Sequence, residues 1–190
     1  MPDFKRREKT DEIIVHHTAD TYGGMQYAKT RDYHVGTLGW LDIGYHYFIE
    51  RSGTVLTGRP EWAEGAHAKG HNDRAIGVAL AGDFTQEQIT PAQDRALVAL
   101  LAKLKGKYPA AAIKGHNDVN ATACPGNIPM SKYRQITADA QKGAQGVTVG
   151  EGVVSIPIGE QVGQAAALVV IGVGFLMLIK AAGGVLPDMD

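Results

Sequence analysis

A capped helix over residues 90–107 constrains the fold more than any other feature of this 190-residue sequence. Thr90 stands at the N-cap position, Pro91 at the first helical position and Gln93 at the third, which is the pattern of a capping box. The helix carries one apolar stripe with helical spacing, made of Leu97, Leu100, Leu101 and Leu104. A helix with one apolar face needs an apolar surface to cover, so the rest of the chain has to supply one.

Short apolar runs on both sides of this helix supply that surface. They are rich in β-branched residues and are bounded by glycine, proline or turn sequences, which is typical of buried strands. Because such runs alternate with helices, the sequence predicts an α/β domain with a mixed central β-sheet flanked by helices. The predicted strands cover 12–17, 45–50, 54–57, 76–80 and 113–114, the further helices cover 25–38 and 131–141, and a loop covers 61–74.

Charge and cysteine content narrow the class of protein. The formal net charge is −1, so no overall field attracts nucleic acid, and we interpret the basic stretch FKRREK (4–9) as a solvated arm. One cysteine cannot form an internal disulfide. The first residues, MPDFKRREKTDE, lack the apolar region of a secretory signal peptide.

The composition changes after the predicted domain, which we assign to residues 1–142. Residues 143–161 are rich in glycine and valine with almost no charge, as expected for a linker. Residues 165–179 contain no polar side chain. We therefore expect a C-terminal apolar helix over 162–182, which either enters a membrane or joins a helix bundle, followed by a short tail over 183–190.

Cys124 stands in a context that favours chemistry over simple packing. His116 precedes it within a loop-like stretch, GHNDVNATACPG (115–126), and His16 ends the first predicted strand. Two imidazoles and one thiolate suit a catalytic zinc with an open fourth position. The CxxC motif of disulfide oxidoreductases is absent, whereas a buried inert thiol and a cysteine–histidine nucleophile both stay open at this point.

Other candidate side chains are less specific. His67 and His71 have the spacing of two ligands on one helix face, but the glycines around them argue against a helix. His17 is expected to point away from His16, because neighbouring residues of a strand face opposite sides. Tyr45 begins a predicted strand, where it either packs its ring or donates a hydrogen bond to a reacting group.

Taken together in order, four motifs resemble the zinc N-acetylmuramoyl-L-alanine amidases, and most of all the branch that contains phage T7-type lysozyme and the peptidoglycan recognition proteins. The resemblance extends roughly from residue 12 to residue 134. The motifs are HHTAD (16–20), GWLDIGYHYFIERSGTV (39–55), GAHAKGHNDRAIGVALAGDF (65–84) and KGHNDVNATACPG (114–126).

The resemblance implies specific roles for single residues. His16, His116 and Cys124 match the zinc ligands, and Tyr45 matches the catalytic tyrosine. Thr122 occupies the position that is lysine in the T7-type enzymes and threonine in many catalytic recognition proteins, so a neutral donor replaces a charge near the scissile carbonyl. Substrate-groove positions of the family match His67, Lys69 and Asn72.

The implied activity is hydrolysis of peptidoglycan, at the amide between N-acetylmuramic acid and L-alanine of the stem peptide, by zinc-activated water. A bacteriophage endolysin or virion-associated lysin fits this activity in a chain without a signal peptide, and it would act on the cell wall from the virion or from the host membrane or periplasm. Two alternatives stay open: a peptidoglycan-binding module without activity, and a membrane-anchored structural protein of a virion.

Overall fold

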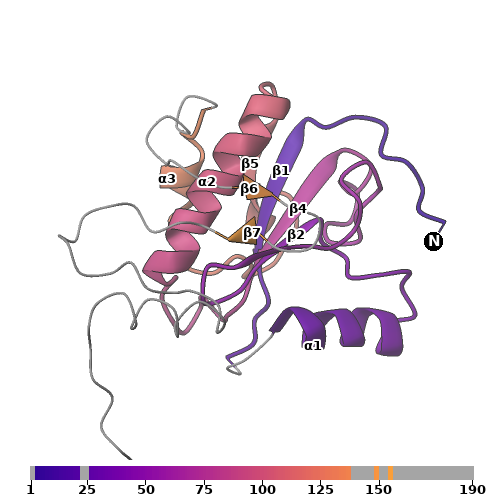
Figure 1. The fold of residues 1–190 in the computed structure, drawn as a ribbon, viewed down its shortest axis with the longest axis horizontal. Helices are drawn as coiled ribbons and strands as arrows, with labels where there is room; N and C mark the ends of the chain where they lie inside the picture. The colour runs from indigo at the N-terminus through magenta and orange to yellow at the C-terminus, as the bar shows by residue number, and fades with distance from the viewer. Residues whose placement is uncertain (1–2, 22–25, 138–147, 150–153, 156–190) are drawn as a thin grey trace, which may run out of the picture. The chain divides into compact units, whose positions relative to one another are not determined.

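A mixed β-sheet forms the centre of the computed structural model, which describes residues 3–21, 26–137, 148–149 and 154–155 (Figure 1). The strand order is β5-β1-β4-β2-β3-β7-β6. The first four strands in this order run parallel to their neighbours, and the other pairs are antiparallel, which confirms the predicted sheet. The strands are β1 (Glu12–His17), β2 (Tyr47–Ile49), β3 (Val55–Thr57), β4 (Ala75–Leu80), β5 (Ala112–Gly115), β6 (Thr148–Val149) and β7 (Val154–Ser155).

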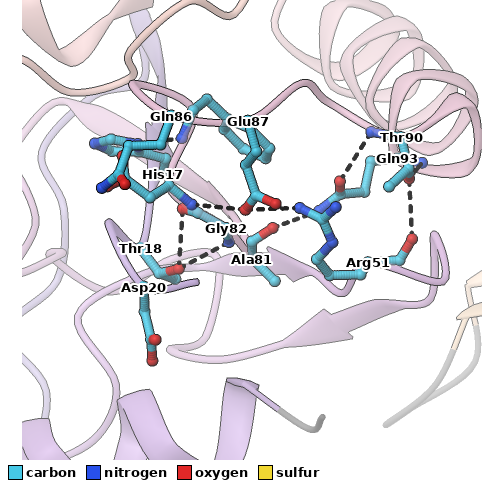
Figure 2. A network of polar contacts seen from close by, with 12 residues as sticks. His17, Thr18, Asp20, Arg51, Ala81, Gly82, Gln86, Glu87, Thr90 and Gln93 are labelled. Carbon is cyan, nitrogen blue, oxygen red and sulfur yellow. Dashed lines mark hydrogen bonds and ion pairs between the residues drawn. The ribbon is translucent and has the colours of Figure 1, made fainter. Parts of the chain in front are cut away.

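Helix α2 (Pro91–Lys107) packs its leucine stripe against one face of this sheet, as the sequence predicts. The capping box is present: Thr90 Oγ1 accepts from the Gln93 backbone N–H at 3.0 Å, and Gln93 Oε1 accepts from the Thr90 N–H at 3.2 Å. The buried Gln93 amide also donates to the Ala81 carbonyl at 2.8 Å, so the helix start is fixed to the end of β4 (Figure 2). Full burial of each leucine contributes about 1.5–3 kcal/mol.

The opposite face of the sheet carries helix α1 (Gln26–Asp32), which continues as a π-helical turn, η1 (Tyr33–Thr37). Glu50, at the end of β2, accepts from the first backbone N–H groups of α1, those of Gln26 at 3.2 Å and Tyr27 at 2.8 Å. A carboxylate stabilises the positive end of a helix, so this contact fixes where α1 begins on the sheet. The Tyr27 ring then packs edge-on against Phe48 of β2.

The helix predicted over 131–141 is wrong for residues 134–137, which are not helical. Helix α3 spans Met130–Tyr133, and the chain then turns, with the Ile136 N–H bonded to the Tyr133 carbonyl. The turn returns Ile136 to the core, where it is 9% exposed, and a continued helix would lose this burial. Residues 138–141 lie outside the described part of the chain.

Beyond the domain, the structure describes few of the residues discussed above. β6 and β7 lie within the segment expected as a linker, and β7 extends the sheet by pairing with β3. The apolar helix expected over 162–182 and the tail over 183–190 lie outside the described residues. Within the described ranges, no helix combines the length and apolar character that crossing a membrane requires.

Candidate metal centre and its cleft

The two histidines at the end of β1 face opposite sides of the sheet. His16 lies on the face away from α2 and is 1% exposed. His17 points toward α2, where its ring stacks on Phe84 and its Nδ1 accepts from the Phe84 N–H at 3.1 Å. The next residue, Thr18, accepts from the Gly82 N–H at 2.9 Å, which ties the end of β1 to the end of β4 (Figure 2). The contacts of His17 and Thr18 thus fix the end of β1, which carries His16 on the face away from α2.

Three ligand-type side chains meet at this point from distant parts of the sequence. His116 begins the short 3₁₀ helix η2 (His116–Asp118) directly after β5, which pairs with β1. Cys124 follows in the next loop, and its sulfur accepts from the His17 backbone N–H at 3.4 Å. The potential ligand atoms of His16, His116 and Cys124 all lie within 4.8 Å of one another.

The geometry of this cluster fits zinc. His16 Nδ1 and Cys124 Sγ are 3.7 Å apart. Two ligands of one tetrahedral zinc, with bonds of about 2.0 Å to nitrogen and about 2.3 Å to sulfur, are separated by about 3.5 Å. Two nitrogen donors and one sulfur donor are also the ligand chemistry that zinc prefers.

The remaining nitrogen of each histidine is already used. His16 Nε2 lies 3.0 Å from His67 Nδ1, and His116 Nε2 lies 3.1 Å from Asn120 Oδ1. Both contacts leave Nδ1 as the nitrogen that can bind a metal. Ligating histidines normally donate their other ring N–H to such a partner.

Burial sets the protonation of these groups. It lowers the pKa of His16 well below the usual range, with neighbouring histidines adding to the effect, and it also lowers the pKa of His116. Burial raises the pKa of Cys124 to about 11, although the His17 backbone N–H acts in the opposite direction. The imidazoles are thus neutral at pH 7, ready to bind a cation, whereas the thiol must lose its proton when a metal binds.

An open cleft of about 360 Å³ exposes this cluster. Tyr45 lines the cleft with its ring 5.2 Å from that of His16, and burial raises its pKa, so the hydroxyl remains a donor at neutral pH. Thr122 also lines the cleft, and its oxygen accepts from the Cys124 N–H at 3.2 Å, which leaves the hydroxyl hydrogen free to donate. The lining residues are His16, His17, Ala19, Tyr45, Asp83, Thr85, His116, Thr122, Ala123 and Cys124.

The three residues expected to bind substrate are not among the residues that line this cleft. His67 is partly buried and contacts His16, while Lys69 is exposed on the same loop. Asn72 Oδ1 accepts from the backbone N–H groups of His67 at 2.9 Å and Ala68 at 3.0 Å, so this side chain shapes the loop.

Sequence reasoning missed three polar residues near the cluster. Asp83 and Thr85 line the cleft just after β4. A sequence signal for them exists, because neighbouring parallel strands end at the same edge of a sheet, and β1 ends there just after His16. Asn120, the partner of His116, stands in a loop sequence that carries no such signal.

Comparison with known proteins agrees with this geometry. The family model described as N-acetylmuramoyl-L-alanine amidase (Amidase_2) matches residues 6–127. The endolysin of Escherichia phage T7 is 43% identical over 128 residues, which cover 64% of this chain and 84% of the phage protein.

Two solved structures are similar as well. The N-acetylmuramoyl-L-alanine amidase LysC from Clostridium intestinale URNW is 42% identical with a TM-score of 0.61, covering 65% of this chain and 82% of LysC. Drosophila PGRP-LB is 28% identical with a TM-score of 0.64, covering 70% of this chain and 85% of that protein. The family match spans more than half of the sequence, and so this chain belongs to the N-acetylmuramoyl-L-alanine amidase family.

Proposed function

We propose that this chain is a zinc-dependent peptidoglycan amidase that hydrolyses the amide between N-acetylmuramic acid and L-alanine of the stem peptide. The observation that carries the proposal is the cluster of His16, His116 and Cys124, which opens into a cleft shared with Tyr45. When bound, zinc would lower the pKa of water toward about 7 and polarise a carbonyl oxygen. The phage relatives named as endolysins support a role as a bacteriophage lysin.

Tyr45 and Thr122 are the two donors that face the reacting groups in this proposal. Both line the cleft, and both retain a hydroxyl hydrogen for the carbonyl oxygen as it gains negative charge. Thr122 offers a neutral hydrogen bond, and its oxygen is oriented by the Cys124 N–H. The position of the Thr122 hydroxyl is therefore set by the same loop that holds Cys124.

The environment of Cys124 favours a ligand over a nucleophile. A nucleophilic cysteine needs a thiol whose pKa is lowered by a charged or helical neighbour. Burial instead raises the pKa of Cys124, and the nearest imidazole, that of His16, has a lowered pKa. These neighbours do not stabilise the thiolate form of Cys124. A bound metal would stabilise it, because a coordinating thiol is deprotonated.

The bond that is cleaved tests the proposal. Purified full-length chain incubated with peptidoglycan is expected to release new amino termini of L-alanine without new reducing sugar ends. Chelation of zinc should abolish the release, and added Zn²⁺ should restore it. Reducing ends without new amino termini would indicate a glycosidase, and binding without release of either product would favour a peptidoglycan-binding module.

A further inference from the structure

The two histidines of the metal cluster both connect to one loop. We call residues 65–72 the 65–72 loop. His67 of this loop contacts His16, with 3.0 Å between Nδ1 and Nε2. On the other side of the cluster, Asn120 accepts from His116 Nε2 at 3.1 Å and donates its amide N–H to the Lys69 carbonyl at 3.2 Å. The Nε2 atoms of His16 and His116 are thus both connected to the 65–72 loop, the first through the His67 side chain and the second through Asn120.

We propose that the 65–72 loop is the outer shell of the metal site, with His67 and Asn120 as positioning residues for His16 and His116. The inference rests on the zinc site proposed above and gives His67 a role other than substrate binding. His67 and Asn120 each fix which ring nitrogen of their ligand histidine carries the proton and which one faces the metal.

The hydrogen-bond directions are consistent for His67. A His16 ring that binds through Nδ1 carries its proton on Nε2 and donates it to His67 Nδ1. His67 must then carry its own proton on Nε2. That atom is buried without a hydrogen-bond partner of good geometry, although the Ala75 backbone carbonyl lies close to the ring.

The position of the His67 ring is built into the sheet. Gly77 lies within β4, and a Cβ atom there would come within 2.5 Å of the ring. A Cβ atom on Gly65 would come within 2.4 Å of the same ring. Glycine inside a strand often marks such a close approach. The Asn72 side chain accepts a hydrogen bond from the backbone N–H of His67. Gly65, Gly77 and Asn72 together therefore keep this imidazole in contact with His16.

Substitution of His67 tests the first contact in the full-length protein. His67→Phe keeps a ring but removes the acceptor, and we expect zinc to bind about 10–100-fold more weakly, as is typical when an outer-shell partner is lost. His67→Asn places an amide oxygen where Nδ1 stood and should recover most of the affinity. The measurements are competition with a chromophoric chelator and the visible spectrum of the Co²⁺-substituted protein, which reports ligand geometry.

A histidine of the same loop provides the matched control. His71 lies 2.6 Å from Glu12 and does not contact the ligand histidines by hydrogen bond. His71→Asn retains a donor for Glu12 and should bind zinc with the affinity of the wild type. If His67→Asn were as weak as His67→Phe, or His71→Asn as weak as either, the effect would come from packing of the loop and the inference would be wrong.

Asn120 gives an independent test at the second ligand histidine, on a partly buried side chain. Asn120→Ala removes the acceptor for His116 and should weaken zinc binding by about 10-fold or more. Asn120→Asp keeps an acceptor and should match or exceed the wild-type affinity. Wild-type affinity and an unchanged Co²⁺ spectrum in both Asn120→Ala and His67→Phe would overturn the inference. Failure of the wild type itself to bind zinc would instead remove the proposed function.

Discussion

At the scale of single residues, substitution of Cys124 or His16 gives the most direct test, because each residue is proposed to supply one of three protein ligands. Loss of one ligand from a three-ligand site should leave zinc too weakly held to survive dialysis against a chelator. We expect about one zinc per chain in the wild type and near none in Cys124→Ala or His16→Ala. Elemental analysis measures this directly, and full zinc content in either variant would remove that residue from the ligand set.

Tyr45 separates catalysis from metal binding. Tyr45 lines the cleft without being a proposed ligand, so Tyr45→Phe should lower turnover by about 100-fold, the typical effect of one positioned donor. Zinc content should stay at the wild-type level. Product release from peptidoglycan, measured beside elemental analysis, checks both expectations, and undiminished turnover would make Tyr45 a packing residue.

Buried His46 predicts how stability depends on pH. Burial lowers its pKa to about 4, although the hydrogen bond that the ring donates to the Ala63 carbonyl acts in the opposite direction. The unfolded chain binds a proton at this residue below about pH 6.5, and the folded chain resists it until about pH 4. The free energy of unfolding should therefore fall as the pH drops through this window, by about 3 kcal/mol from His46 alone.

Denaturant unfolding in chelator between pH 7 and pH 4 measures this loss. The chelator removes the contribution of a bound metal, so the slope reports the buried histidines. Stability that does not change across this window would contradict the burial of a neutral His46.

Some residues of the candidate site could be predicted from the sequence and others could not, and the difference has a physical reason. His16, His116 and Cys124 belong to motifs whose chemistry requires those side chains, and the structure brings them together. Asn120 is proposed to act through the ring of His116, and many side chains could accept that hydrogen bond. The contact of His67 with His16 depends on the space that Gly77 leaves, which appears only when β4 is placed beside β1.

At the scale of elements, Gly77 within β4 offers a test of how tightly the sheet is packed under the 65–72 loop. Gly77→Ala would place a methyl group within 2.5 Å of the His67 ring, which is too close for the ring to stay where it is. Overpacking of this kind destabilises a protein by about 1–3 kcal/mol.

Gly36 of η1 is the matched control, because an added Cβ atom there meets nothing within 4 Å. Gly36→Ala should leave the free energy of unfolding unchanged or raise it by up to about 1 kcal/mol. Urea unfolding of both variants measures the difference, and equal stability of the two would show that the His67 ring is loosely held.

The elements themselves were predictable where a local signal fixes them. Helix α2 has its capping box and leucine stripe within its own residues, so its bounds agree with the sequence. Helix α3 ends early because Ile136 is drawn into the core by residues far away in the sequence. β7 pairs with β3 across a separation that periodicity cannot detect.

At the scale of the whole molecule, the segment 162–182 remains a proposal, since it lies outside the described residues. We propose that it inserts into membranes, because large aliphatic residues contribute roughly 0.3–0.6 kcal/mol each to insertion at the centre of a helix. Full-length chain should float with liposomes, and a chain truncated after residue 161 should stay behind while keeping its amidase activity. A soluble full-length oligomer would instead indicate an assembly helix.

The proposed ligands His16 and Cys124 stand 108 positions apart in the sequence, and the pairing of β1 with β5 brings their segments together. A zinc ion that joins them would close a loop through most of the domain, much as a disulfide does, but with a bond that a chelator can remove. Free zinc at 1,000 times its dissociation constant would add about 4.1 kcal/mol to the folded state. A lysin built in this way would be most resistant to unfolding where zinc is present and easily degraded where it is scarce.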